Sequence, residues 1–446
     1  MKRYQTYKPS GIEWLGKIPE HWEVKRVKDI AVGITGFAFN SSKYSDSGIK
    51  LVRGINVKES VLNWNDTSYW PSISPDLKRF LLKSNDVLIQ MDGSKVGKNF
   101  CIVKNEDLPL ILVQRVTRLR TIRTVNSKYL FYSIVSSRFY DWISIRKTDP
   151  MVPHITLKDI EEFVVLGATP SEQTAIVNYL DNKTAAIDLK IELLTAKVNK
   201  YKALRRSLIN ETVCRGLNPD ATLKDSGIEW IGKIPEHWDV KRMKDIGFLF
   251  SGLSGKSGDD FNQDENENNR DFIPFTNIFN NDTINPNVMG KVVVFENEKQ
   301  NKVKKDDLFF LMSSEDYDGL GKSSLLTVDL KETYLNSFCK GFRTTKKQVF
   351  PAFLNYQLQS DTFRKVMQIE GKGFTRLNLK SEKVTDFNVF IPNTIDEQQN
   401  IVDYLDEKTT QIDTILINIG EQINKLTQLR KTLINDVVTG QLKVTE

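Results

Sequence analysis

One feature of this sequence constrains its fold more than any other: two long segments each occur twice. Residues Ser10 through Ile30 return 216 positions later as Ser226 through Ile246, with three conservative changes among 21 positions. Residues Glu172 through Asp188 return 225 positions later as Glu397 through Asp413, with 11 of 17 positions identical. Two matches of this length in the same order do not arise by chance, so the chain consists of one structural unit used twice.

The stretches between the repeated segments diverge. Residues 31–168 and 247–390 resemble each other only faintly, yet each contains a polar turn that leads into an apolar strand, at 84–90 and at 305–311. Both stretches therefore predict mixed α/β domains set between constant segments. The other expected elements are a strand at 110–120 with Arg118 and Arg120 on one face, and short helices at 128–136 and 352–369.

The second repeated segment predicts a long helix in each half. Thr169 with Glu172, and Thr394 with Glu397, form capping boxes at the two helix starts. Apolar residues then recur at spacings of four and three, which predicts a coiled-coil seam that one arginine interrupts in each copy. The seam positions are Ile187, Ile191, Leu194, Val198, Tyr201, Arg205 and Leu208, and Ile412, Leu416, Ile419, Ile423, Leu426, Arg430 and Leu433.

These helices suit a spacer better than a domain core. At about 40–45 residues each would extend roughly 60 Å, which is too long to fold back inside a compact domain. Matched seams favour an antiparallel pair. The expected fold class is thus α/β (α+β), with two globular domains separated by two antiparallel coiled-coil helices and related by a pseudo-twofold repeat. The expected divisions are 1–168 and 217–390 for the two domains, and 169–216 and 391–446 for the two spacer helices.

The composition excludes several classes of protein. No run of about 18 apolar residues occurs, so no membrane span is predicted, and the first residues lack the apolar stretch of a secretory signal. Cys101, Cys214 and Cys339 are far apart and give neither a disulfide framework nor a zinc site. The net charge of +6 allows a polyanionic partner without requiring one. We therefore expect a protein of the cytoplasm.

Two patterns resemble enzyme motifs but are incomplete. The run from Gly319 to Ser323 is like a phosphate-binding loop, but Asp316 stands where that motif needs its first glycine. Glu20, Glu23 and Lys25 resemble a compressed nuclease signature, although nucleases hold their carboxylates on separate strands. No glycine-rich cofactor loop and no motif for amino-group methylation occurs in the sequence. The sequence predicts no active site.

The repeated segments resemble those of the specificity subunits of type I restriction–modification systems. The resemblance rests on the two Gly-Ile-Glu-Trp-x-Gly-x-Ile-Pro-Glu-His-Trp segments and the two Glu-Gln-x-x-Ile-Val-x-Tyr-Leu-Asp segments, and it extends from Tyr7 through Leu442. It implies two target recognition domains that each read half of a split double-stranded DNA target, held apart by the helices.

The resemblance also implies partners. Two adenine methyltransferase subunits would dock on the repeated segments, and two restriction (translocase) subunits would complete the complex, in a bacterial or archaeal cell. These partners would supply S-adenosylmethionine, ATP and metal ions, so no cofactor or metal is expected in this chain. Because the two variable domains differ, we expect an asymmetric target.

Candidate DNA-binding residues follow from side-chain type and position. Cationic side chains suit phosphates, whereas Gln, Ser, His and Arg can reach base edges. The loop at 371–376 is favoured because its glycines permit close approach of the backbone. The phosphate candidates are Arg115, Arg118, Lys147 and Lys372; the base-edge candidates are Gln90, Ser94 and His154 in the first domain and Ser313, Ser314, Thr375 and Arg376 in the second.

Two alternatives remain open on sequence grounds. The long helices could organise proteins in a scaffold that does not read DNA, although the basic variable stretches argue against this. The segment from Glu20 to Lys25 could instead belong to a free-standing nuclease. Metal-dependent cleavage by the purified chain, abolished by Glu23→Ala, would identify that nuclease.

Overall fold

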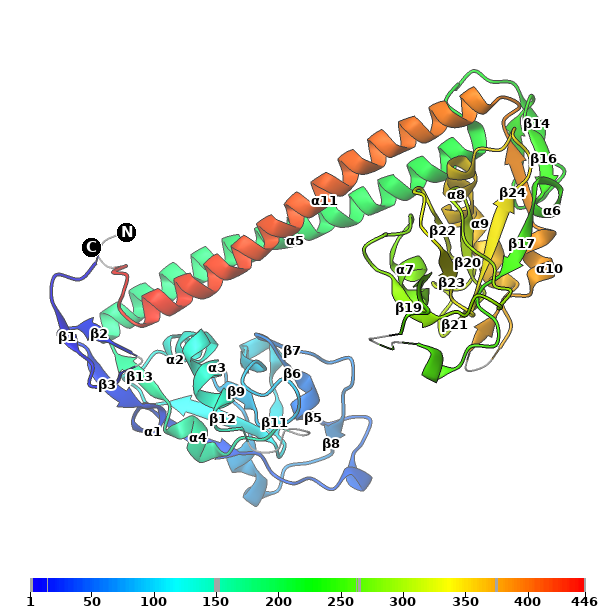
Figure 1. The fold of residues 1–446 in the computed structure, drawn as a ribbon. Coiled ribbons are helices and arrows are strands. Elements are labelled where there is room, and N and C mark those ends of the chain that lie inside the picture. The colour runs from blue at the N-terminus through cyan, green and yellow to red at the C-terminus, as the bar shows by residue number, and fades with distance from the viewer. Residues whose placement is uncertain are drawn as a thin grey trace. The chain divides into compact units, whose positions relative to one another are not determined.

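The chain folds into two compact units. The computed structural model describes residues 3–13, 15–147, 153–261, 263, 266–373 and 376–444. The first unit comprises Met1–Thr195 with Gly420–Glu446, and the second comprises Ala196–Ile419 (Figure 1). Each unit thus holds one variable domain, one copy of both repeated segments and a part of each long helix. Within the described residues, none of the helices has the length and apolar character that crossing a membrane requires.

The variable domain of the first unit is built on two small sheets. One has the strand order β10-β9-β12-β4, with all its neighbours antiparallel, and the other has the order β11-β5-β8, with β11 parallel to β5. Helix α2 packs against β9, β10 and β12. The elements are β4 Ala31–Thr35, β5 Ile49–Val52, β6 Val57–Lys58, β7 Val61–Leu62, β8 Tyr69–Trp70, β9 Val87–Gln90, β10 Phe100–Ile102, β11 Leu110–Leu112, β12 Val116–Thr121, α2 Ser127–Val135, α3 Ser137–Ser144 and α4 Leu157–Glu161.

The variable domain of the second unit repeats this topology. Its sheets have the orders β17-β24-β20-β22 and β19-β18-β23, again with one parallel pair, β18 with β23. Two stretches of sequence that resemble each other only faintly therefore share one fold, which confirms the predicted mixed α/β class. The elements are β17 Gly247–Ser251, β18 Asn269–Ile273, α7 Phe275–Asn280, β19 Gly290–Val293, β20 Leu308–Leu311, β21 Ser313–Ser314, β22 Ser323–Leu325, β23 Thr333–Leu335, β24 Cys339–Thr344, α8 Pro351–Gln359, α9 Asp361–Ile369, β25 Leu377–Asn378 and α10 Ser381–Thr385.

Two expected elements are each divided in the structure. The predicted strand at 110–120 forms β11 and β12, which belong to different sheets, because Arg115 turns the chain with a φ of +69°. The predicted helix at 352–369 forms α8 and α9. Ser360 breaks it with an extended backbone, and its hydroxyl donates to the carbonyl of Gln357. The helix expected at 128–136 is present as α2, and the polar turns do lead into β9 and β20.

A pair of short strands connects each variable domain to the constant part of its unit. In the first unit β3 (Glu23–Arg26) pairs with β13 (Val164–Gly167), and in the second β16 (Asp239–Arg242) pairs with β26 (Asn388–Ile391). A one-turn helix follows β3 and β16, so the variable domain enters and leaves beside the same two-stranded sheet. The other elements of the constant part are β1 Tyr7–Pro9, β2 Lys17–Pro19, α1 Val27–Ile30, β14 Leu223–Asp225, β15 Lys233–Pro235 and α6 Met243–Ile246.

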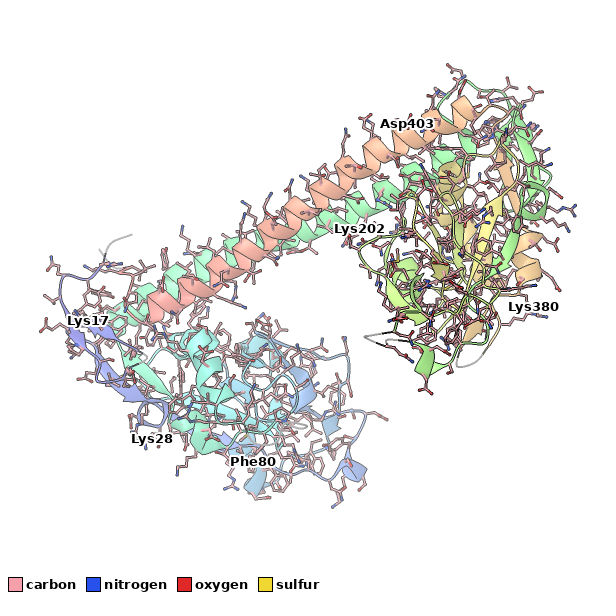
Figure 2. All side chains as sticks on the ribbon, in the orientation of Figure 1. Lys17, Lys28, Phe80, Lys202, Lys380 and Asp403 are labelled. Carbon is pink, nitrogen blue, oxygen red and sulfur yellow. The ribbon has the colours of Figure 1, made fainter. Side chains whose placement is uncertain are left out.

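The two long helices are α5 (Pro170–Arg215, 46 residues) and α11 (Ile395–Val438, 44 residues). Each would measure about 65–70 Å at 1.5 Å per residue. In each unit their segments lie side by side and run antiparallel (Figure 1). Side chains on the outer faces, such as Lys202 and Asp403, point to solvent (Figure 2).

The arginines that interrupt the predicted seams form ion pairs between the helices. In the first unit Nε of Arg430 lies 2.8 Å from a carboxylate oxygen of Asp188. In the second unit Nε of Arg205 lies 3.3 Å from a carboxylate oxygen of Asp413. Since Asp188 and Asp413 are the last residues of the two copies of one repeated segment, the same ion pair occurs once in each unit.

The two repeated segments of each unit meet at the start of its long helix. In the first unit Nε1 of Trp22 donates to both carboxylate oxygens of Glu172 at 3.2 Å, and Nε2 of His21 lies 2.9 Å from one of them. Glu172 also accepts from the backbone and hydroxyl of Thr169, which confirms the first capping box. Trp22 is fully buried. We call this arrangement the frame joint.

The second unit forms the same joint from the same residue types. Nε1 of Trp238 donates to Glu397 at 2.9 Å, Nε2 of His237 lies 2.9 Å from the same carboxylate, and Trp238 is fully buried. The His-Trp pairs thus anchor the start of each domain.

The variable domains contact the long helices through two further duplicated hydrogen bonds. The backbone N–H of Asn126 donates to Gln173 in the first unit, as that of Phe350 donates to Gln398 in the second. The hydroxyl of Tyr132 donates to Asp181, as that of Tyr356 donates to Asp406. Each variable domain is therefore attached to its helix by the same bonds, despite the divergence of the two sequences.

Candidate nucleic-acid interface

In the first unit, most of the predicted DNA-binding residues gather around the segment that follows β9. The N–H of Met91 donates to the carbonyl of Arg115 at 2.9 Å, and the N–H of Ile155 donates to the carbonyl of Met91 at 2.9 Å. An isolated bridge then joins Asp92 to His154. Residues far apart in sequence are thus brought together by backbone pairing.

The side chains of this cluster are polar and partly exposed. Nη1 of Arg115 lies 2.8 Å from a carboxylate oxygen of Asp92, and 60% of the Arg115 side chain is exposed. The amide oxygen of Gln90 accepts a hydrogen bond from Asn99 at 2.7 Å. Ser94 is exposed and His154 is half-buried. We call Gln90, Asp92, Ser94, Arg115 and His154 the first cluster.

Arg118 lies elsewhere. Its side chain points into the domain, with 5% of the residue exposed, and burial, followed by the nearby Arg120, lowers the pKa of its guanidinium. This position does not present a charge to a phosphate. Lys147 is half-buried, with its ammonium 4.9 Å from the centre of the Tyr140 ring, where Lys98 also lies at 4.8 Å. These two lysines form a small basic patch that suits a phosphate.

In the second unit, the predicted residues also lie close together. Ser313 and Ser314 form β21, which pairs with β25, and Lys372 exchanges two backbone hydrogen bonds with Asn378 at 2.9 and 3.1 Å. Lys372 and Arg376 are exposed. The guanidinium of Arg376 lies 5.1 Å from the centre of the Phe338 ring.

The two serines are placed differently from the cationic residues. Both are buried, and Oγ of Ser314 accepts from the N–H of Asp316, so they hold the loop rather than face outward. Thr375, also predicted, lies outside the described residues. We call Ser313, Phe338, Lys372, Arg376 and Asn378 the second cluster.

The register of the sheets equates the two clusters. Gln90 lies opposite Val116 in the first unit, and Leu311 lies opposite Cys339 in the second. Arg115 and Phe338 immediately precede those partners, so they occupy the same backbone position. By the same argument Asp92 corresponds to Ser313, and His154 to Asn378.

Sequence reasoning missed Asp92, Phe338 and Asn378. Asp92 could have been found, because it follows a buried strand directly, in the same place as the serines that were predicted. Phe338 carries no such signal, since an aromatic residue before an apolar strand normally indicates core. It is nevertheless 54% exposed.

Two arginines of the predicted basic stretches have structural partners instead. Arg120 donates through Nε and Nη2 to the carboxylate of Asp86, with both distances 2.7 Å. Arg343 makes the same pair of bonds with Asp307, also at 2.7 Å. Both carboxylates are buried, and each also accepts a backbone N–H from the preceding turn. These bidentate pairs fix the turn before β9 and before β20.

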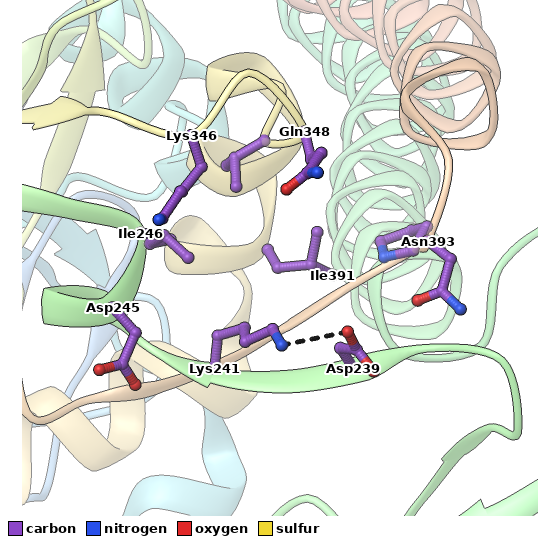
Figure 3. Close-up of a pocket in the computed structure, with 10 residues that line it drawn as sticks. Asp239, Lys241, Asp245, Ile246, Lys346, Gln348, Ile391 and Asn393 are labelled. Atoms are coloured by element: carbon purple, nitrogen blue, oxygen red, sulfur yellow. Dashed lines mark ion pairs between the residues drawn. The ribbon is translucent and has the colours of Figure 1, made fainter.

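The second unit also contains an open groove of about 640 Å³ beside the strand pair β16 and β26 (Figure 3). Lys241 in this groove forms an ion pair with Asp239 at 3.1 Å. Lys346 and Asp245 add one further charge of each sign. Because the charges are mixed and the groove is lined in part by the strands β16 and β26, which join the variable domain to the constant part, we do not assign it to DNA.

The incomplete enzyme motifs have ordinary structural places. The run from Gly319 to Ser323 leads into strand β22 rather than a helix, and the ammonium of Lys322 donates to the carbonyl of Phe279. Glu23 lies on β3 and forms an ion pair with Lys25 at 3.0 Å. Among the residues that the structure describes, no group of three or more His, Cys, Asp or Glu side chains is arranged to hold a metal ion.

One protein family matches most of the chain. The sequence model of the type I restriction modification DNA specificity domain matches residues 19–199 and again residues 235–425. The specificity subunit of the type I restriction enzyme EcoAI from Escherichia coli is 30% identical over 186 residues, which is 41% of this chain and 31% of that protein. The MjaVIII specificity subunit of Methanocaldococcus jannaschii is 25% identical and covers 96% of this chain and 94% of its own.

Solved structures share the fold. A chain from a type I R-M system, solved to explain complex assembly and conformational transition, matches 95% of this chain and 99% of its own with a TM-score of 0.73 and 14% identity. The HsdS subunit from Thermoanaerobacter tengcongensis matches 95% of this chain and 98% of its own with a TM-score of 0.54 and 15% identity. At these identities the likeness concerns the arrangement of elements.

Proposed function

Because the chain belongs to the family of type I restriction–modification DNA specificity proteins, we propose that its two variable domains each read one half of an asymmetric, split DNA target. The chain is the DNA specificity subunit of such a system. One observation carries the finer proposal: the same frame joint and the same helix attachments hold two domains whose exposed clusters differ. Constant attachment with variable surface is what two distinct half-site readers need.

The long helices would set the distance between the two half-sites. We assign residues 1–168 and 217–390 to the two target recognition domains, and residues 169–216 and 391–446 to the two spacer helices. The duplicated ion pairs between α5 and α11 support a fixed register of the helices. The number of unspecified base pairs would then be a property of the helices and not of the readers.

The duplication also supports the partners. The constant part occurs in two equivalent copies, which suits the binding of two copies of one adenine methyltransferase subunit. Two restriction (translocase) subunits would complete the complex. These partners would supply S-adenosylmethionine, ATP and metal, and this chain would perform no chemistry itself. The complex would act in the cytoplasm of a bacterial or archaeal cell, where it meets double-stranded DNA.

We assign the DNA contacts to the two clusters and the basic patch. Gln90, Ser94, Arg115 and His154 would face DNA in the first unit, with Lys147 on a phosphate. Lys372, Thr375 and Arg376 would do so in the second unit. The buried Ser313 and Ser314 would support the loop, and the buried Arg118 leaves the set.

A methylation map tests this function. The chain is expressed with the adenine methyltransferase encoded beside it, in a host without other adenine methylation, and the DNA is read by a modification-sensitive long-read method. Methylated adenines in one bipartite, non-palindromic motif, present only with this chain, are the expected result. A folded and bound methyltransferase without any motif would favour the scaffold that does not read DNA.

The non-catalytic role has its own test. The purified chain is incubated with DNA and Mg²⁺ or Mn²⁺. No cleavage is expected from the wild type or from Glu23→Ala. Metal-dependent cleavage that Glu23→Ala abolishes would replace this proposal with a nuclease.

A further inference from the structure

We propose that one residue in each unit selects one base of its half-site. These residues are Arg115, which immediately precedes β12, and Phe338, which immediately precedes β24. Arg115, oriented by Asp92, would read a G·C pair, and Phe338 would read a thymine. This inference rests on the proposed function and names the residues that give the two half-sites different sequences.

The backbone makes this position a presenting site. Arg115 has a φ of +69°, a left-handed conformation that is uncommon outside glycine and asparagine and is enriched at functional sites. It separates β11 from β12, which belong to different sheets, and 60% of its side chain is exposed. Its carbonyl accepts from Met91, which fixes the residue from the other side of the turn. The side chain is therefore exposed on a rigid backbone.

The partner of Arg115 argues for a base and against a phosphate. Asp92 lies 2.8 Å from the guanidinium, and its side chain is 19% exposed. A carboxylate at this distance repels a phosphate but suits a base pair. In the major groove guanine presents two acceptors, N7 and O6, which arginine binds with two donors, while the N4 amino group of cytosine donates to a carboxylate. An arginine and an aspartate held side by side match both members of a G·C pair.

The equivalent position in the second unit has the opposite character. Phe338 is 54% exposed, so much of a large apolar ring is open to solvent. The only thymine-specific group in the major groove is a methyl group, and apolar side chains such as phenylalanine read it. Arg376, 5.1 Å from the ring centre, covers one face of Phe338 and would hold it in place by a cation–π contact.

The first experiment maps methylation by the assembled complex carrying Arg115→Ala, Arg115→Lys or Asp92→Asn. Each variant is expected to relax the motif at one G·C pair of one half-site, by roughly 5- to 100-fold in discrimination, and to leave every other position intact. Arg115→Lys should relax it too, because the flexible ammonium of lysine lacks the rigid, planar pair of donors that a guanidinium presents. Arg123→Ala, which removes an exposed charge beyond the other end of β12, is the control and should leave the motif unchanged.

The results separate this inference from the proposed function. If Arg115→Ala lowers methylation equally at every site without changing the motif, Arg115 is a phosphate contact and the inference fails. It also fails if the variants keep the wild-type motif at full strength, or if Asp92→Asn relaxes a different base pair. If the wild-type complex itself produces no motif, the proposed function fails instead. Assembly with the methyltransferase is measured for every variant, so that a folding defect is recognised.

The second experiment uses Phe338→Ser, with Phe248→Ser, another exposed phenylalanine of the same unit, as its control. Phe338→Ser should let cytosine or uracil replace thymine at one position of the other half-site, whereas Phe248→Ser should not. Unchanged discrimination between thymine and uracil at every position, in DNA substrates containing either base, would overturn the assignment of Phe338.

Discussion

At the scale of single residues, one carboxylate in each unit holds the two repeated segments together. Although burial alone would raise the pKa of Glu172, its hydrogen bonds with His21, Thr169 and Trp22 lower it. Because the folded pKa lies below the ordinary value of 4.5, the ionised group stabilises the fold above that pH, and this contribution is lost as the pH falls through the lowered pKa.

We therefore predict that Glu172→Gln weakens the fold at neutral pH and reduces the loss of stability in acid. The expected decrease in the free energy of unfolding at pH 7 is about 1–2 kcal/mol, typical of hydrogen bonds to a charged group. Urea unfolding followed from about pH 7 to about pH 3 measures both effects. Glu192→Gln, on an exposed face of α5, is the control, and equal behaviour of the two variants would show that the joint contributes nothing.

The ion pair between the buried Asp86 and the partly exposed Arg120 leads to a second prediction. Arg120→Ala leaves a carboxylate that is 1% exposed without its bidentate partner, and we expect a loss of about 3 kcal/mol in stability. Unfolding by denaturant measures this, with Arg123→Ala as the exposed control. Unchanged stability together with weaker DNA binding would instead place Arg120 on the DNA-binding surface.

At the scale of elements, periodicity predicted where helices and strands run but not where they break. Arg115 divides a predicted strand and Ser360 divides a predicted helix, and neither has a glycine, proline or asparagine beside it to mark a turn. At both breaks the backbone is bonded to a distant segment, Arg115 to Met91 and Asp361 to Asn210, and local sequence does not reveal these partners. The assignment of Arg118 to the surface was wrong because its part of β12 is buried, which the local sequence does not show.

The ion pairs between the long helices give the third prediction. Asp188→Arg places two like charges together in the first unit, and we expect it to destabilise the helix pair by about 1 kcal/mol, with Arg430→Asp in the same chain restoring most of the loss. A double-mutant cycle by chemical denaturation measures the coupling. The equivalent pair, Asp413 with Arg205, should show a coupling of the same sign. Additive effects would mean that the arginines do not set the register.

At the scale of the whole molecule, the duplicated plan was predictable, whereas the residues of the two clusters could be predicted only in part. The frame joint follows from identical residues, so sequence identified both copies of His-Trp and of the capped helix. The first cluster joins Asp92, Arg115 and His154, which backbone pairing in a divergent domain brings together. The sequences of the two variable domains are too different to reveal that Arg115 and Phe338 are equivalent.

The methylation map of a chimera shows whether each variable domain reads its own half-site. Residues 31–163 are replaced by residues 247–387, so that the variable domain of the second unit occurs in both units. The hydrogen bonds of Phe350 with Gln398 and of Tyr356 with Asp406 match those of the domain removed, so the transplanted domain keeps its attachments. We expect the methylated motif to keep the wild-type number of base pairs between its half-sites. Both half-sites should have the sequence of the wild-type second half-site, arranged as an inverted repeat. Two results would contradict this expectation when the methyltransferase is bound: methylation of the original asymmetric motif, or methylation of a motif in which both half-sites have changed.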